Sequence, residues 1–108
     1  MKGLKNLPID NPKKLGDLIN YEKNQVVSMS LSNSEYSHMM LFSFPEGEML
    51  EEEKYPLNTM YLAVEGEVII KQGDKINILK EGEVFMVPAD VFHEIGGKKA
   101  FKLLQINI

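Results

Sequence analysis

The 108-residue chain contains no cysteine, which excludes disulfides, thiolate metal sites and cysteine nucleophiles. It also contains no arginine, because all 12 of its basic residues are lysines. Without the rigid fork of a guanidinium there is no bidentate recognition of phosphate or carboxylate, and this disfavours phosphorylated ligands. The formal net charge of -4 argues against a nucleic-acid partner, which normally requires a basic face.

Long apolar segments are missing as well. No window approaches the roughly 20 apolar residues of a membrane span. The N-terminal stretch MKGLKNLPIDNPKK has no apolar run long enough for a signal peptide. We therefore expect no membrane partner and a cytoplasmic location. The hydrophobic content of 44% and the charged content of 26% are ordinary for a globular protein, and the length fits one domain.

The N-terminal segment, residues 1–24, differs in pattern from the rest. Its first part is polar with scattered apolar residues and predicts an extended arm. Asn11-Pro12 is a helix-start signal, because Asn can cap a helix and Pro fits the first helical position. A short helix over residues 12–19 would place Leu15, Leu18 and Ile19 on one face. Two turns are not stable alone, so this face should dock on the domain or on a partner subunit.

From residue 25 onward the sequence has the pattern of short β-strands. Apolar and polar residues are interleaved over short segments, and Gly, Pro, Asn, Asp or Ser stand between the segments. The predicted strands span residues 25–30, 35–44, 59–65, 68–72, 75–79, 84–87, 91–95 and 101–108. This regular spacing predicts an all-β fold, an antiparallel sandwich or barrel, over residues 25–108.

Two stretches of the chain have the spacing of a known pair of motifs. At the positions of the first motif, G-x5-H-x-H-x3-E-x6-G, stand Gly47, Glu53, Tyr55, Thr59 and Gly66. At the positions of the second motif, G-x5-P-x-G-x2-H-x3-N, stand Gly82, Pro88, Asp90, His93 and Gly97. On these residues the chain resembles a small, single-domain cupin of the conserved-barrel type. The resemblance implies a double-stranded β-helix, the cupin or jelly-roll barrel, preceded by the arm and the short helix.

The resemblance also implies a metal site, and this chain departs from it at the ligands. In metal cupins two His and one Glu of the first motif, with the His of the second, bind one divalent cation. By position these ligands would be Glu53, Tyr55, Thr59 and His93. Thr59 is a weak neutral donor, and Tyr55 would have to ionise well below the usual phenol pKa of about 10. We therefore expect no cofactor. If a divalent metal does bind, the ligands would be His93 and Glu53.

Each candidate residue also has an ordinary structural interpretation. His93 could be a buried hydrogen-bonded imidazole, a polar anchor for a small molecule, or a metal ligand. Glu53 ends an acidic run that is typical of a solvated loop, but a Glu53 pointing into the barrel could share a proton with His93. Tyr55 and Tyr61 are most often packing residues with a hydroxyl at a wet edge, although either could line a pocket.

Three functions remain as hypotheses. The first is a binding protein that holds a small molecule in the barrel mouth without metal, with a pocket formed by Glu53, Tyr55, Thr59, Tyr61 and His93. The second, implied by the resemblance, is a metal-dependent isomerase, decarboxylase or dioxygenase that uses His93 and Glu53. The third is a dimeric sensor or accessory protein. Residues 59–64 are apolar on both strand faces, and both faces must be covered, so we expect a homodimer.

Overall fold

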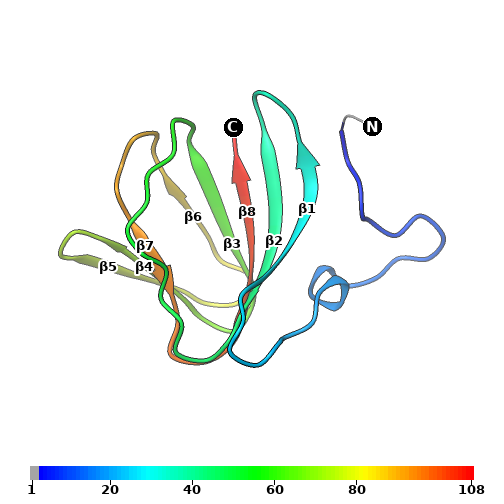
Figure 1. The fold of residues 1–108 in the computed structure, drawn as a ribbon, viewed down its shortest axis with the longest axis horizontal. Helices are drawn as coiled ribbons and strands as arrows, with labels where there is room; N and C mark the ends of the chain where they lie inside the picture. The colour runs from blue at the N-terminus through cyan, green and yellow to red at the C-terminus, as the bar shows by residue number, and fades with distance from the viewer. Residues whose placement is uncertain (1–2) are drawn as a thin grey trace.

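Two antiparallel sheets face each other across an apolar core in the computed structural model, which describes residues 3–108 (Figure 1). Residues 1 and 2 of the predicted arm lie outside the described residues. The elements are η1, Leu15–Leu18; β1, Val27–Asn33; β2, His38–Phe44; β3, Thr59–Glu65; β4, Val68–Gln72; β5, Lys75–Leu79; β6, Val84–Val87; β7, Glu94–Gly96; and β8, Phe101–Asn107. The predicted all-β, double-stranded β-helix is confirmed.

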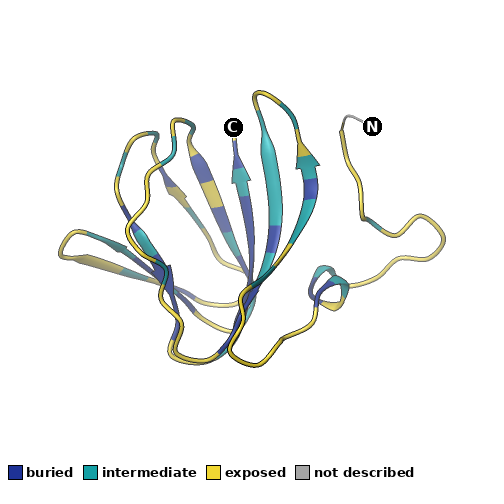
Figure 2. Cartoon of the chain, in the orientation of Figure 1, coloured by how far each residue is buried: buried dark blue, intermediate teal, exposed yellow. Residues whose placement is uncertain are grey.

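Strand β8 runs through the middle of the larger sheet. That sheet has the order β1-β2-β8-β3-β6, and the smaller sheet has the order β5-β4-β7. Side chains of β8 alternate, as a strand requires. Phe101 and Leu103 belong to the core between the sheets, whereas Leu104 and Ile106 belong to a second apolar cluster on the outer face. Almost the whole of β8 is therefore buried (Figure 2).

Four motif positions, Gly47, Gly66, Gly82 and Asp90, have a left-handed backbone. Gly66 has φ 74°, and a Cβ atom there would lie 3.0 Å from the carbonyl oxygen of Ala100, so no other residue fits easily. Asp90 stands where the second motif has glycine, and it keeps the required conformation with φ 63°. Asp tolerates this region better than most residues. The turn geometry of the motif is thus retained despite the substitution.

The four consecutive strands β3 to β6 have the bounds predicted from the sequence. The prediction of a strand over residues 91–95 is wrong in its bounds, since β7 is Glu94–Gly96. The amide of Val91 donates to the carbonyl of Pro88 in a turn (3.4 Å), and His93 pairs with Glu53 as an isolated bridge. The first two strands also begin later than predicted, at Val27 and His38.

The predicted helix over residues 12–19 is wrong in type and length. The structure has a single 3-10 turn, η1, preceded by Lys14 in an extended conformation with no side-chain cap. The three apolar residues of the predicted helix, Leu15, Leu18 and Ile19, nevertheless pack on the outer face of the larger sheet, which is the first of the two docking alternatives, the domain or a partner subunit. Within residues 3–108, no helix has the length and apolar character needed to cross a membrane.

A buried lysine fastens this segment to the sheet. Lys102 on β8 is 6% exposed, and its Nζ donates to the carbonyl of Gly16 (2.5 Å) and lies 3.2 Å from Oε2 of Glu65. The same ammonium lies 4.7 Å from the ring centre of Tyr21, whose hydroxyl donates to Oε1 of Glu65 (3.1 Å). Burial, helped by this hydrogen bond, raises the pKa of Tyr21 to about 12. A buried charge is tolerated only when it is compensated in this way.

The arm and η1 leave part of the outer face uncovered. Met60 on β3 is 36% exposed, and Val84 and Met86 on β6 are 61% and 56% exposed. The register pairs Met60 with Met86, so their side chains share one face of the sheet. The apolar outer face predicted for residues 59–64 is thus covered by the chain's own N-terminal segment on one side and exposed on the other.

Replacing Lys102 by Met should lower the free energy of unfolding by about 1–3 kcal/mol, because the carbonyl of Gly16 and the carboxylate of Glu65 lose their partner. Urea unfolding measures this loss. The matched control is Lys71→Met, which removes a half-exposed ion pair with Glu94 (3.6 Å) and should cost about 0–1 kcal/mol. Equal losses in the two variants would contradict the anchoring role of Lys102.

Candidate functional site

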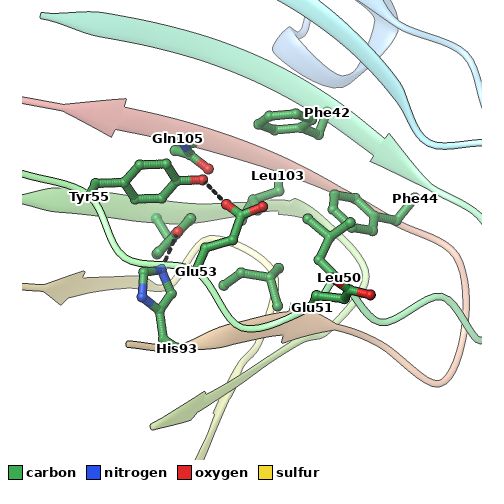
Figure 3. Close-up of a pocket in the computed structure, with 11 residues that line it drawn as sticks. Phe42, Phe44, Leu50, Glu51, Glu53, Tyr55, His93, Leu103 and Gln105 are labelled. Carbon is green, nitrogen blue, oxygen red and sulfur yellow. Dashed lines mark hydrogen bonds between the residues drawn. The ribbon is translucent and has the colours of Figure 1, made fainter. Parts of the chain in front are cut away.

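A cavity of about 120 Å³, partly open to solvent, lies between the two sheets. Figure 3 shows the side chains that line it. Its apolar wall comes from β2, β8, β7 and the segment before Glu51: Phe42, Phe44, Leu50, Ile95 and Leu103. Its polar lining consists of Glu51, Glu53, Tyr55, Tyr61, His93 and Gln105. Four of the five predicted pocket residues therefore meet at one cavity.

The innermost polar pair of this cavity is Tyr61 and His93. Both side chains are buried, with exposed fractions of 1% and 2%, and the Tyr61 hydroxyl lies 2.7 Å from Nε2 of His93. Nδ1 of His93 lies 2.9 Å from the carbonyl oxygen of Val91. A carbonyl can only accept, so Nδ1 carries the hydrogen, and Nε2 of the neutral ring accepts from the Tyr61 hydroxyl. Both ring nitrogens are thereby satisfied inside the protein.

Burial raises the pKa of Tyr61 far above the usual phenol value, with smaller contributions from the nearby Tyr55 and Glu53. The hydroxyl consequently remains a neutral donor, which is the form that the hydrogen bond to His93 requires.

A second pair, Tyr55 and Glu53, lies at the mouth of the cavity. The Tyr55 hydroxyl donates to Oε2 of Glu53 at 2.5 Å, and the carboxylate points toward the cavity (Figure 3). Burial raises the pKa of Tyr55 to about 12, and the hydrogen bond to Glu53 acts in the same direction. Tyr55 is therefore a protonated donor at neutral pH, not a phenolate.

Main-chain hydrogen bonds join the segment at the mouth, which carries Glu53, to the segment that carries the buried His93. The amide of Glu53 donates to the carbonyl of His93 (2.9 Å), and the amide of His93 donates back to the carbonyl of Glu53 (2.8 Å). The side chains of these two residues nevertheless take different partners: Glu53 accepts from Tyr55, and His93 bonds to Tyr61 and Val91. Within residues 3–108 the structure therefore shows no shared proton between Glu53 and His93.

Thr59 is the predicted pocket residue that does not line the cavity. It is 1% exposed, and its Oγ1 accepts from Nδ2 of Asn107 at 2.6 Å. Oδ1 of Asn107 in turn accepts from Nε2 of Gln105 (3.1 Å). Thr59 thus ends a buried chain of polar side chains that reaches the cavity only at Gln105.

The divalent cation implied by the cupin resemblance does not fit these residues. Nε2 of His93 accepts from Tyr61, an oxygen of Glu53 accepts from Tyr55, and Oγ1 of Thr59 accepts from Asn107. Across residues 3–108 there is no cluster of three or more His, Cys, Asp or Glu side chains in a metal-binding arrangement. One imidazole and one carboxylate, both engaged elsewhere, fall short of the donor set that first-row metals need.

The sequence reasoning missed the residues that shape the cavity away from the motifs. Gln105 is one of them, and its signal was a polar side chain at an inward position of β8 between Leu103 and Asn107. Glu51 is another. It belongs to an acidic run that is exposed, as predicted for a solvated loop, yet it also borders the cavity. No spacing rule separates Glu51 from its neighbour Glu52.

Replacing Tyr61 by Phe should lower the free energy of unfolding by about 1–3 kcal/mol, because Nε2 of His93 is left buried without a partner. Imidazole ¹⁵N NMR of the wild type should show hydrogen on Nδ1 and an accepting Nε2, and the Nε2 resonance should shift in the variant. Tyr36→Phe is the control, since Tyr36 is 74% exposed. A wild-type ring with hydrogen on Nε2, or equal stability losses in the two variants, would contradict the assignment.

Comparison with known proteins shows which solved structures the chain is similar to. No protein-family model and no curated protein matches its sequence. A cupin superfamily protein from Desulfitobacterium hafniense is 44% identical, covers 98% of this chain and 97% of its own, and has a TM-score of 0.95. A cupin 2 conserved barrel domain protein from Leptotrichia buccalis is 28% identical, with 87% of this chain and 46% of that chain covered and a TM-score of 0.84. A conserved protein of unknown function from Streptococcus pyogenes has the same fold at 20% identity, with coverage of 100% and 95% and a TM-score of 0.93. At 44% identity over nearly the full length of both chains, the first of these shows that the protein belongs to the cupin superfamily.

Proposed function

We propose that this cupin binds a small molecule in its barrel cavity and does so without a bound metal. The observation that carries the proposal is the hydrogen bond from Tyr61 to Nε2 of His93. It occupies the one imidazole that the metal motifs retain, and it leaves beside it a cavity with apolar walls.

The size of the cavity supports a small ligand. Its volume is about 120 Å³, and an apolar cavity of about 150 Å³ is known to hold one benzene molecule. Phe44, Ile95 and Leu103 are among the apolar lining residues. Tyr55, His93 and Gln105 lie together on the side away from Phe44, whereas Glu51 lies beside Leu50 (Figure 3). A site of this kind typically buries the body of a ligand and orients its polar end with a few fixed groups.

The competing function is a metal-dependent enzyme that uses His93 and Glu53. It would require Tyr61 to leave Nε2 and Tyr55 to leave the Glu53 carboxylate, so that both donors could turn toward a common centre. Each departure gives up a hydrogen bond, and the first one gives up a fully buried bond.

Metal analysis of the untagged protein, purified without added metal, separates the two functions. We expect substoichiometric Mn, Fe, Ni and Zn, and no rise in the melting temperature when these ions are added. Stoichiometric metal that is lost in His93→Ala would overturn the proposal.

The binding half of the proposal needs its own readout. Titration with 1-butanol, a neutral probe with fewer heavy atoms than benzene, should shift the amide NMR signals of Ile95 and Leu103 in a saturable way. Leu50→Phe, which adds volume at the wall of the cavity, should weaken these shifts. Shifts that do not saturate, or that persist unchanged in Leu50→Phe, would contradict binding in this cavity.

We also propose that the protein is a homodimer and that Met60, Val84 and Met86 form the contact. These three residues are exposed, uncharged and close together on the outer face of β3 and β6. They continue the apolar cluster that the N-terminal segment covers elsewhere on the same sheet, through Leu62 and Ile106. The three side chains are uncharged and add no like-charge repulsion between two copies, although each chain carries a net charge of -4. A dimer of this kind is also what an accessory or sensor role would use.

Light scattering at micromolar concentration should give twice the chain mass for the wild type. Met86→Lys should give a monomer, because a C2 contact would place two buried ammonium groups in one interface. Ile76→Lys is the matched control, since Ile76 is 59% exposed on β5 in the other sheet. A monomeric wild type, or a dimer that survives Met86→Lys, would contradict this contact surface.

A further inference from the structure

We propose that the ligand of the cavity is a small organic cation, an alkyl or arylalkyl ammonium compound whose apolar body enters the barrel while its charged nitrogen stays at the mouth. This inference rests on the proposed function and specifies the chemical class that the same cavity accepts.

The charge around the cavity has one sign. Two carboxylates, Glu51 and Glu53, line it, and no lysine of residues 3–108 does. The neighbouring Lys54 points its ammonium at the ring of Phe92, 5.0 Å from the ring centre, and takes no part in the lining. A carboxylate or phosphate ligand would therefore meet two like charges and no compensating cation, and this contact would be repulsive.

The hydrogen-bonding groups at the mouth are mainly acceptors. Oε2 of Glu53 accepts the hydrogen bond from Tyr55, and Oε1 has no hydrogen-bond donor within residues 3–108. The hydroxyl hydrogens of Tyr55 and Tyr61 are committed to Glu53 and His93. An ammonium supplies three hydrogen-bond donors and has no acceptor that would require a donor from the protein. It therefore complements this lining better than an anion does.

Aromatic rings flank the same space. Phe42 and Tyr55 lie on either side of the region into which the Glu53 carboxylate points (Figure 3). The face of an aromatic ring attracts a cation placed within about 6 Å of its centre. Phe44 and Leu103 lie deeper and are fully buried, so they can receive an apolar body. The cavity thus joins an apolar interior to an anionic, aromatic mouth.

Three probes of nearly the same shape test this inference: n-butylammonium, 1-butanol and butyrate, each titrated into the full chain at neutral pH and low salt and followed by amide NMR shifts. We expect n-butylammonium to bind roughly threefold to tenfold more tightly than 1-butanol, in line with a partly screened charge contact. Butyrate should show no saturable binding. Added salt should weaken n-butylammonium more than 1-butanol, because salt screens only the charged contact.

The Glu53→Gln variant isolates the charge. It keeps an oxygen that can accept from Tyr55 and removes the carboxylate, so the preference for n-butylammonium over 1-butanol should fall markedly, and Glu51, which still lines the cavity, should account for what remains. Glu52→Gln is the matched control: it changes the net charge equally at an exposed neighbour that does not line the cavity. That variant should keep the preference.

The possible results separate the inference from the function on which it rests. If 1-butanol binds as tightly as n-butylammonium, the cation inference fails and the metal-free binding function stands. If none of the three probes binds in a saturable way, both fail. If Glu52→Gln reduces the preference as much as Glu53→Gln does, the effect comes from the overall negative field of the surface, and the assignment to the cavity is overturned.

Discussion

The hydrogen bond between Tyr61 and His93 determines what the interior of this barrel can hold. A buried imidazole needs partners for both nitrogens, and an unsatisfied nitrogen costs about 1–3 kcal/mol. In this chain the partners are the carbonyl of Val91 and a phenol from β3, both supplied by the protein itself. Both ring nitrogens are therefore satisfied inside the protein, and the remaining space has apolar walls.

The mouth of the cavity depends on the same histidine through the main chain. Residues 50–55 run beside residues 93–95 and bond to them in three places: the amide of Leu50 donates to the carbonyl of Ile95, and Glu53 and His93 exchange two bonds. The amide of Asp90 also donates to the carbonyl of Tyr55 (2.7 Å), at the end of this segment. The position of the Glu53 carboxylate is thus fixed by the backbone of the residue that carries the buried imidazole. Interior and mouth form one structural unit.

Much of the fold could be predicted from the sequence, because strand alternation and turn residues are local signals. The bounds of β3 to β6 follow from clear turns such as Gly66-Glu67 and Gly73-Asp74. The N-terminal helix was mispredicted for a tertiary reason. The carbonyl of Gly16, which an α-helix would pair with the amide four residues further on, accepts instead from Lys102, 86 residues away in sequence. No pattern within residues 11–19 contains that information.

The candidate site was predicted in part, and the gaps have a physical origin. Motif spacing identified Glu53, Tyr55 and His93, because it encodes which backbone positions face the barrel interior. Spacing does not encode which side chain bonds to which, so the pairing of Tyr61 with His93 and of Tyr55 with Glu53 could not be deduced. The position of Thr59 shows the same limit: it faces inward but bonds to Asn107 beyond the end of the cavity.

The contacts of Lys102 have a consequence for how the N-terminal segment can be exchanged between copies. Its bonds to Gly16 and Glu65, and the packing of Leu18 on the sheet, would be the same whether the segment came from its own chain or from a neighbour. The interface energy therefore does not distinguish a closed protomer from a domain-swapped one. The connection decides: Glu22 and Gln25 form a bridge around Asn24, whose φ of 60° turns the chain back toward its own sheet. The four-residue turn of residues 22–25 therefore sets which sheet the N-terminal segment covers, and the apolar contact between the segment and the sheet does not.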